Sequence, residues 1–129
     1  VDGWDAAIKV SALATALMDF PLKPQDVERK GIREITPEMV NQARFEKKRW
    51  KLIASAERAG SRIKARVTPE LVDSSSPLYG MLGSSTGLTF GTDVLPDYSI
   101  SVSEREGMKS GPEETAYGLL ADFVNAVRG

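Results

Sequence analysis

The sequence contains neither cysteine nor histidine. Their absence excludes disulfide bonds, thiol nucleophiles and most transition-metal sites, so no metal site is expected. The side chains that remain for proton transfer are those of lysine, aspartate, glutamate and tyrosine. The lack of cysteine also agrees with a cytoplasmic protein.

An excess of charge of either sign is lacking too, because the formal net charge is −1. No general attraction to nucleic acid or to an anionic membrane follows from such a balance. The sequence has no apolar run long enough for a membrane span and no signal-peptide pattern, so we expect neither nucleic acid nor a membrane as partner.

The length of 129 residues, of which 41% are hydrophobic, predicts a single domain over residues 1–129 with one core. The chain begins with Val1 instead of methionine, only a few residues before an expected helix. We therefore expect it to be a piece of a longer protein.

The first twenty residues are the most informative stretch. From residue 6 to residue 18 every side chain is small or apolar except that of Lys9. The apolar positions lie almost all round a helical wheel, which predicts a mostly buried helix. Asp5 precedes Lys9 by four residues, the spacing at which the two side chains meet on a helix.

This spacing has two interpretations. In one, Asp5 favours the helix dipole and Lys9 extends its ammonium into water as an ordinary ion pair. In the other, Lys9 is buried and functional: loss of water favours release of its proton, whereas Asp5 favours the charged form.

Further elements follow from local signals. Thr36, followed by Pro37, predicts the start of a helix that ends near Lys47. Residues 50–57 and 62–68 form an expected hairpin, in which alternate side chains face the core. We expect a short strand near Val27 or Ile32, a turn or a single helical turn over 68–72, a short helix over 77–81, and strands over 86–92 and 98–104.

These elements predict an α+β fold with a mixed β-sheet of about four to six strands and helices packed mainly on one face. In the last strand Ser99, Ser101 and Ser103 form an uncharged face, which is either exposed or covered by a partner subunit.

A glycine-containing loop over 107–111 leads into a terminal helix with Pro112 in its first turn. Free N–H groups at a helix N-terminus suit an anion such as a cofactor phosphate or a substrate carboxylate. A simple connection between strand and helix is the alternative.

The string Gly3-x-Asp5-x-x-x-Lys9 at the head of a small-residue helix resembles the signature of the homoserine dehydrogenases. The terminal loop is similar to the Gly-Pro-Gly-Ala-Gly loop of that family, with its first and last glycines kept as Gly107 and Gly111. Residues 108–110, Met-Lys-Ser, depart from the family pattern.

The resemblance implies an oxidoreductase of amino-acid biosynthesis that interconverts L-homoserine and L-aspartate 4-semialdehyde with NADP or NAD. Lys9 would transfer the substrate proton as the catalytic residue, and Asp5 and Lys9 would bind the amino-acid substrate. The residues implied near the cofactor are Gly107, Lys109, Ser110, Gly111 and Glu113.

The resemblance covers only the substrate-binding and dimerisation part of such an enzyme, with a homodimer expected through the β-sheet. No Gly-x-Gly-x-x-Gly motif follows a strand here, so the cofactor would be bound mainly by an absent domain, and the fragment alone would be inactive. The alternatives are a paralogous dehydrogenase with another alcohol substrate, or a non-catalytic dimerisation domain.

Overall fold

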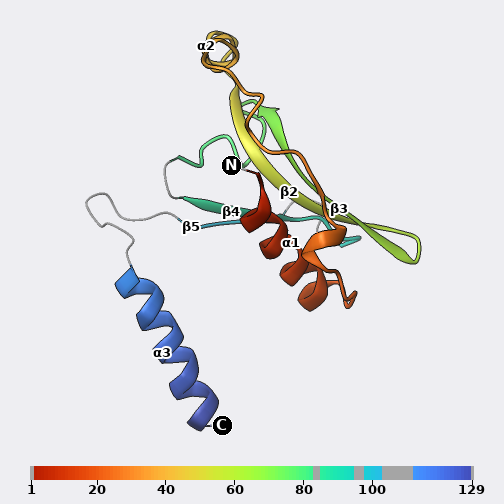
Figure 1. Ribbon diagram of the computed structural model, residues 1–129, viewed down its shortest axis with the longest axis vertical. Coiled ribbons are helices and arrows are strands. Elements are labelled where there is room, and N and C mark those ends of the chain that lie inside the picture. The colour runs from red at the N-terminus through yellow and green to blue at the C-terminus, as the bar shows by residue number, and fades with distance from the viewer. Residues whose placement is uncertain (1, 83–84, 95–97, 103–111, 129) are drawn as a thin grey trace. The chain divides into compact units, whose positions relative to one another are not determined.

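The computed structural model describes residues 2–82, 85–94, 98–102 and 112–128. The chain divides into two compact units, the first ending at Tyr79 and the second beginning at Gly80. The predicted α+β class is confirmed, with helices α1, α2 and α3, a single-turn helix η1, and strands β1 to β5 (Figure 1).

A three-stranded sheet with strand order β1-β3-β2 forms the frame of the first unit. Strands β2 (Arg49–Ala59) and β3 (Arg62–Val72) make the predicted hairpin, in antiparallel register from Arg49 opposite Val72 to Ala59 opposite Arg62. Gly60 supplies the turn with a φ of 63°. The short β1 (Glu28–Arg29) runs parallel to β3, close to the predicted position.

The turn expected over residues 68–72 is wrong, because β3 continues through Pro69 to Val72. The backbone N–H of Lys30 donates to the carbonyl oxygen of Val67, so Val67 points its backbone groups toward β1. Pro69, two residues on, points the same way, beyond the end of β1. Its missing N–H therefore removes no hydrogen bond from the β2–β3 ladder.

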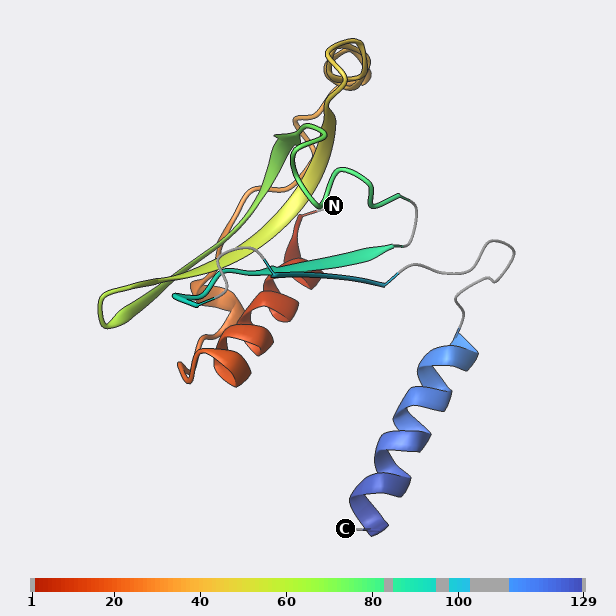
Figure 2. The same cartoon turned by 180° about the vertical axis from the view of Figure 1, so that it is seen from behind.

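Helix α1 (Trp4–Leu17) lies against β2 and β3 and covers one face of this sheet (Figure 2). A core of small side chains joins them, made by Ala7, Val10, Val27, Ala65 and Val67. The predicted alternation is confirmed, since Ala65 and Val67 of β3 are buried and the intervening positions are exposed. Small residues at this contact let the helix approach the sheet closely.

Helix α2 (Pro37–Phe45) lies at the end of the hairpin remote from the turn (Figure 1). Its predicted start is confirmed: the Thr36 hydroxyl accepts a hydrogen bond from the Met39 N–H at 3.3 Å. The helix ends two residues before the expected Lys47, which has a left-handed φ of 57°. It packs beside the cross-strand pair Trp50 and Leu71, on the face that α1 also covers.

The second unit contains an antiparallel ladder, β4 (Thr86–Phe90) with β5 (Tyr98–Val102), and helix α3 (Pro112–Arg128). The two predicted strands are confirmed, and five described strands fall within the expected number, divided between two sheets. The short helix expected over 77–81 is wrong. A turn takes its place, in which the Tyr79 N–H donates to the Ser76 carbonyl oxygen at 3.0 Å.

Candidate functional site

The signature string begins at Gly3, the residue that caps α1. Its φ of 74° lies in the left-handed region that side chains other than glycine rarely adopt. A Cβ atom at this position would lie 2.9 Å from Cγ1 of Val67, closer than such atoms approach. Glycine is therefore required twice, by its backbone conformation and by the contact of the helix start with β3.

Asp5 and Lys9 form an ion pair one helical turn apart, with 2.8 Å between the aspartate Oδ2 and the lysine Nζ. The predicted pairing is thus confirmed. The predicted burial is wrong, because the two side chains are 82% and 71% exposed. No hydrogen bond or ion pair from another described element reaches either side chain.

The sidedness of α1 explains this exposure. The helix buries Ala7, Val10, Ser11 and Ala14 against the sheet, and Lys9 lies two residues from Ala7, on the opposite side. The apolar positions suggested burial all round, but much of that stretch is alanine, which suits either side of a helix. Among the large side chains, Ile8 is 44% exposed and Leu17 is 60% exposed.

Two arginines hold the start of α1 from outside the helix, and sequence reasoning missed both. The guanidinium of Arg29 in β1 lies over the Trp4 ring, 4.4 Å from its centroid. The guanidinium of Arg33 binds both carboxylate oxygens of Asp2, at 2.7 and 3.1 Å. Each pair joins positions more than twenty residues apart, and the parallel placement of β1 beside β3 brings Arg29 near the start of α1.

The predicted cofactor residues Gly107, Lys109, Ser110 and Gly111 lie outside the described residues. Glu113 belongs to the first turn of α3, which begins at Pro112 as expected. The role of these five residues stays a prediction, as does that of Asp5 and Lys9 in binding substrate.

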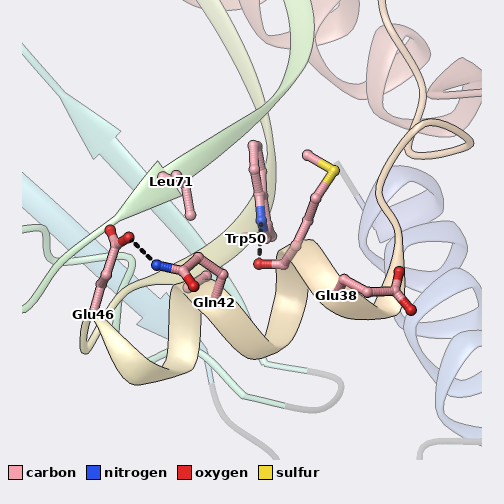
Figure 3. Close-up of a pocket in the computed structure, with 7 residues that line it drawn as sticks. Glu38, Gln42, Glu46, Trp50 and Leu71 are labelled. Carbon is pink, nitrogen blue, oxygen red and sulfur yellow. Dashed lines mark hydrogen bonds between the residues drawn. The ribbon is translucent and has the colours of Figure 1, made fainter.

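A shallow groove with a volume of about 380 Å³ lies between α2 and the adjoining strands (Figure 3). The Trp50 indole N–H donates to the Met39 carbonyl at 3.4 Å, and the Gln42 amide donates to Glu46 at 2.7 Å. That hydrogen bond, together with Lys48, lowers the pKa of Glu46. The Thr36 hydroxyl likewise lowers the pKa of Glu38.

The carboxylates of Glu38 and Glu46 at this groove therefore already interact with residues of α2 or residues next to its ends. Across the described ranges, no group of three acidic side chains is placed to hold a metal ion. Nor is any helix of the described residues both long and apolar enough to cross a bilayer.

Comparison with known proteins places these features in context. A family model described as homoserine dehydrogenase matches residues 1–124. The NAD(+)-dependent homoserine dehydrogenase of Pseudomonas canavaninivorans is 34% identical over 126 residues, which make up 97% of this chain and 34% of that protein. The homoserine dehydrogenase of Methanocaldococcus jannaschii is 33% identical over 125 residues, 97% of this chain and 34% of that protein.

Solved structures agree with this likeness. The S. aureus homoserine dehydrogenase superposes with a TM-score of 0.81 at 25% identity, covering 98% of this chain and 30% of that one. A putative homoserine dehydrogenase from Archaeoglobus fulgidus gives a TM-score of 0.75 at 32% identity, covering 98% of this chain and 36% of that one. The chain thus spans about a third of the length of these relatives.

Proposed function

The chain belongs to the homoserine dehydrogenase family, and from this premise we propose that it is the catalytic and dimerisation part of an oxidoreductase that interconverts L-homoserine and L-aspartate 4-semialdehyde. The chain forms one domain of that enzyme, which acts in the cytoplasm. Its activity depends on a nucleotide-binding domain outside these 129 residues, and the fragment alone is inactive.

The observation that supports this proposal is the direction of the Asp5–Lys9 pair. The signature string places both side chains on the face of α1 that points away from the sheet, joined at 2.8 Å. A substrate can reach that face without disturbing the core. The Asp5 carboxylate holds the Lys9 ammonium in one direction.

The proposed role of Lys9 is to move the proton of the substrate hydroxyl. When homoserine is oxidised, the carbinol carbon loses a hydride and the hydroxyl oxygen loses a proton, which Lys9 accepts in its neutral form. In the reverse direction the Lys9 ammonium returns a proton to the oxygen of the aldehyde. The nicotinamide, when bound, supplies the hydride acceptor or donor.

The described residues fit the substrate side of this reaction better than the cofactor side. No described strand leads through a Gly-x-Gly-x-x-Gly turn into a helix, the arrangement that binds a dinucleotide. We assign the cofactor mainly to the absent domain, with Gly107, Lys109, Ser110, Gly111 and Glu113 contributing from this chain. The name of the Pseudomonas relative favours NAD over NADP.

Exposure of Lys9 in this chain also bears on the mechanism. Proton transfer between a side chain and a substrate is favoured where bulk water is excluded from the site. We propose that the nucleotide-binding domain and the substrate cover this face of α1 in the complete enzyme. Such closure places a charge beside a developing alkoxide in a site of low dielectric constant.

Replacement of Lys9 by alanine in the full-length enzyme tests the assignment. General acid–base help of this kind is worth roughly 10²–10⁴ in rate, so kcat should fall by about that factor while the Kd of the nicotinamide cofactor stays within about twofold. Lys23→Ala is the matched control, because it removes another exposed lysine outside this helix. Near-normal turnover of Lys9→Ala would exclude the lysine from the mechanism.

A paralogous dehydrogenase is the second candidate, favoured by the Met-Lys-Ser sequence at residues 108–110 in place of the family pattern. A panel of amino-acid and hydroxy-acid alcohols decides between the two, since a clear preference for homoserine excludes the paralogue. A non-catalytic dimerisation domain, in which the exposed Asp5–Lys9 pair is an ordinary ion pair, predicts no turnover of any alcohol by the full-length protein.

A further inference from the structure

The first turn of α1 lacks the side-chain cap that most helices use. Gly3 occupies the capping position, and among the described residues no side chain accepts a capping hydrogen bond at this turn. Asp5 lies within that turn and Lys9 one turn further on. The packing of Ala7, Val10 and Ala14 against the sheet sets the side of α1 on which the ion pair lies, and the contacts of the helix start add to that placement.

Three contacts hold the helix start, and two of them involve Val67 of β3 and its partner Arg29 of β1. Gly3 packs on the side chain of Val67 in β3. Arg29 pairs with Val67 in the parallel register of β1 and β3, and its guanidinium lies 4.4 Å from the centre of the Trp4 ring. Arg33 binds Asp2 through two hydrogen-bonded contacts. The residues before and after Gly3 are thus each joined to an arginine.

Of the three contacts, that of Arg29 with Trp4 lies nearest to the ion pair along the chain. Trp4 directly precedes Asp5 in the chain, and both belong to α1. A guanidinium over an indole face is attracted by the negative charge of the ring face, and the two planes can stack. This contact joins the residue before Asp5 to β1, whereas the Asp2–Arg33 pair lies ahead of the helix.

We propose that Arg29, acting through Trp4, is a positioning residue that orients the Asp5–Lys9 pair for proton transfer. This inference rests on the proposed function of Lys9. Arg29 touches neither substrate nor cofactor in this scheme. Arg29 instead affects the position of the Lys9 Nζ atom, and small displacements of a reacting atom strongly reduce the rate of the reaction.

The experiment compares Arg29→Ala, Arg29→Lys and Lys9→Ala in the full-length enzyme. We expect Arg29→Ala to lower kcat about three- to tenfold, with the KM for the nicotinamide cofactor changed less than about twofold. Arg29→Lys keeps a cation over the ring and should recover at least about half of the lost rate, on a logarithmic scale. Arg44→Ala is the matched control, because it removes an exposed arginine from α2.

The outcomes separate positioning from stability. A kcat of Arg29→Ala equal to that of Arg44→Ala overturns the inference, and so does a loss of rate that vanishes after division by the folded fraction measured by circular dichroism. If Arg29→Ala retains full rate while Lys9→Ala is inactive, only the positioning role fails. If Lys9→Ala retains full rate, the proposed function fails as well.

Discussion

Replacement of Gly3 by alanine provides a quantitative test of the contact between α1 and the sheet. An alanine at a φ of 74° costs roughly 1–2 kcal/mol of conformational energy. Its Cβ would also lie 2.9 Å from Cγ1 of Val67, a side chain that is 1% exposed and has little room to move. Overpacking of this kind costs roughly 1–3 kcal/mol.

The reduced freedom of the unfolded chain offsets roughly 0.4–1 kcal/mol of these costs. The net loss in the free energy of unfolding should therefore be about 2–3 kcal/mol. Gly60→Ala is the matched control, since Gly60 has a φ of 63° but no atom within 4 Å of the added Cβ. It should cost only about 0.5–1 kcal/mol.

A double-mutant cycle with Val67→Ala isolates the steric part. Without Cγ1 of Val67 the added methyl group has space, so Gly3→Ala should cost about as much as Gly60→Ala in that background, a coupling of about 1–2 kcal/mol. Urea unfolding of the chain, followed by far-UV circular dichroism, measures each free energy at constant m-value. Equal losses for the two glycine variants, or an additive cycle, would refute the steric argument.

Two further predictions concern acid stability and assembly. The hydrogen bond from Gln42 and the charge of Lys48 lower the pKa of Glu46. The ionised carboxylate therefore stabilises the fold above the ordinary pKa of about 4.3, and this contribution disappears as the pH falls through the lowered value. Glu46→Gln should lose less stability on acidification than the unchanged chain in pH-dependent urea unfolding, and identical acid profiles would contradict this. We also propose a homodimer through the β-sheet, so sedimentation velocity should show a dimer that increases with concentration, whereas a strictly monomeric species at every concentration would count against it.

The sequence predicted the elements whose signals are local. The Thr36 cap, the Gly60 turn and the alternation through Ala65 and Val67 each depend on neighbouring residues, and all are confirmed. The extension of β3 past Pro69 was missed, because the sequence does not show on which side of a strand a proline lacks its N–H. That side is set by the short partner β1.

The candidate site was only partly predictable for the same reason. Four-residue spacing was sufficient to predict the Asp5–Lys9 ion pair. Its exposure depends on which face of α1 meets the sheet, and an alanine-rich helix gives a weak signal for that choice. The contact of Arg29 with Trp4 joins residues twenty-five positions apart, and it follows only from the pairing of β1 with β3.

The proline in β3 also affects how this protein meets other copies of itself. Beyond the two residues of β1, the flank of β3 that faces away from β2 presents Pro69 where an incoming strand would seek a donor. A strand that paired with this flank would receive no hydrogen bond from Pro69, which has no N–H, and would meet the proline ring. A proline at such a position discourages edge-to-edge pairing of strands.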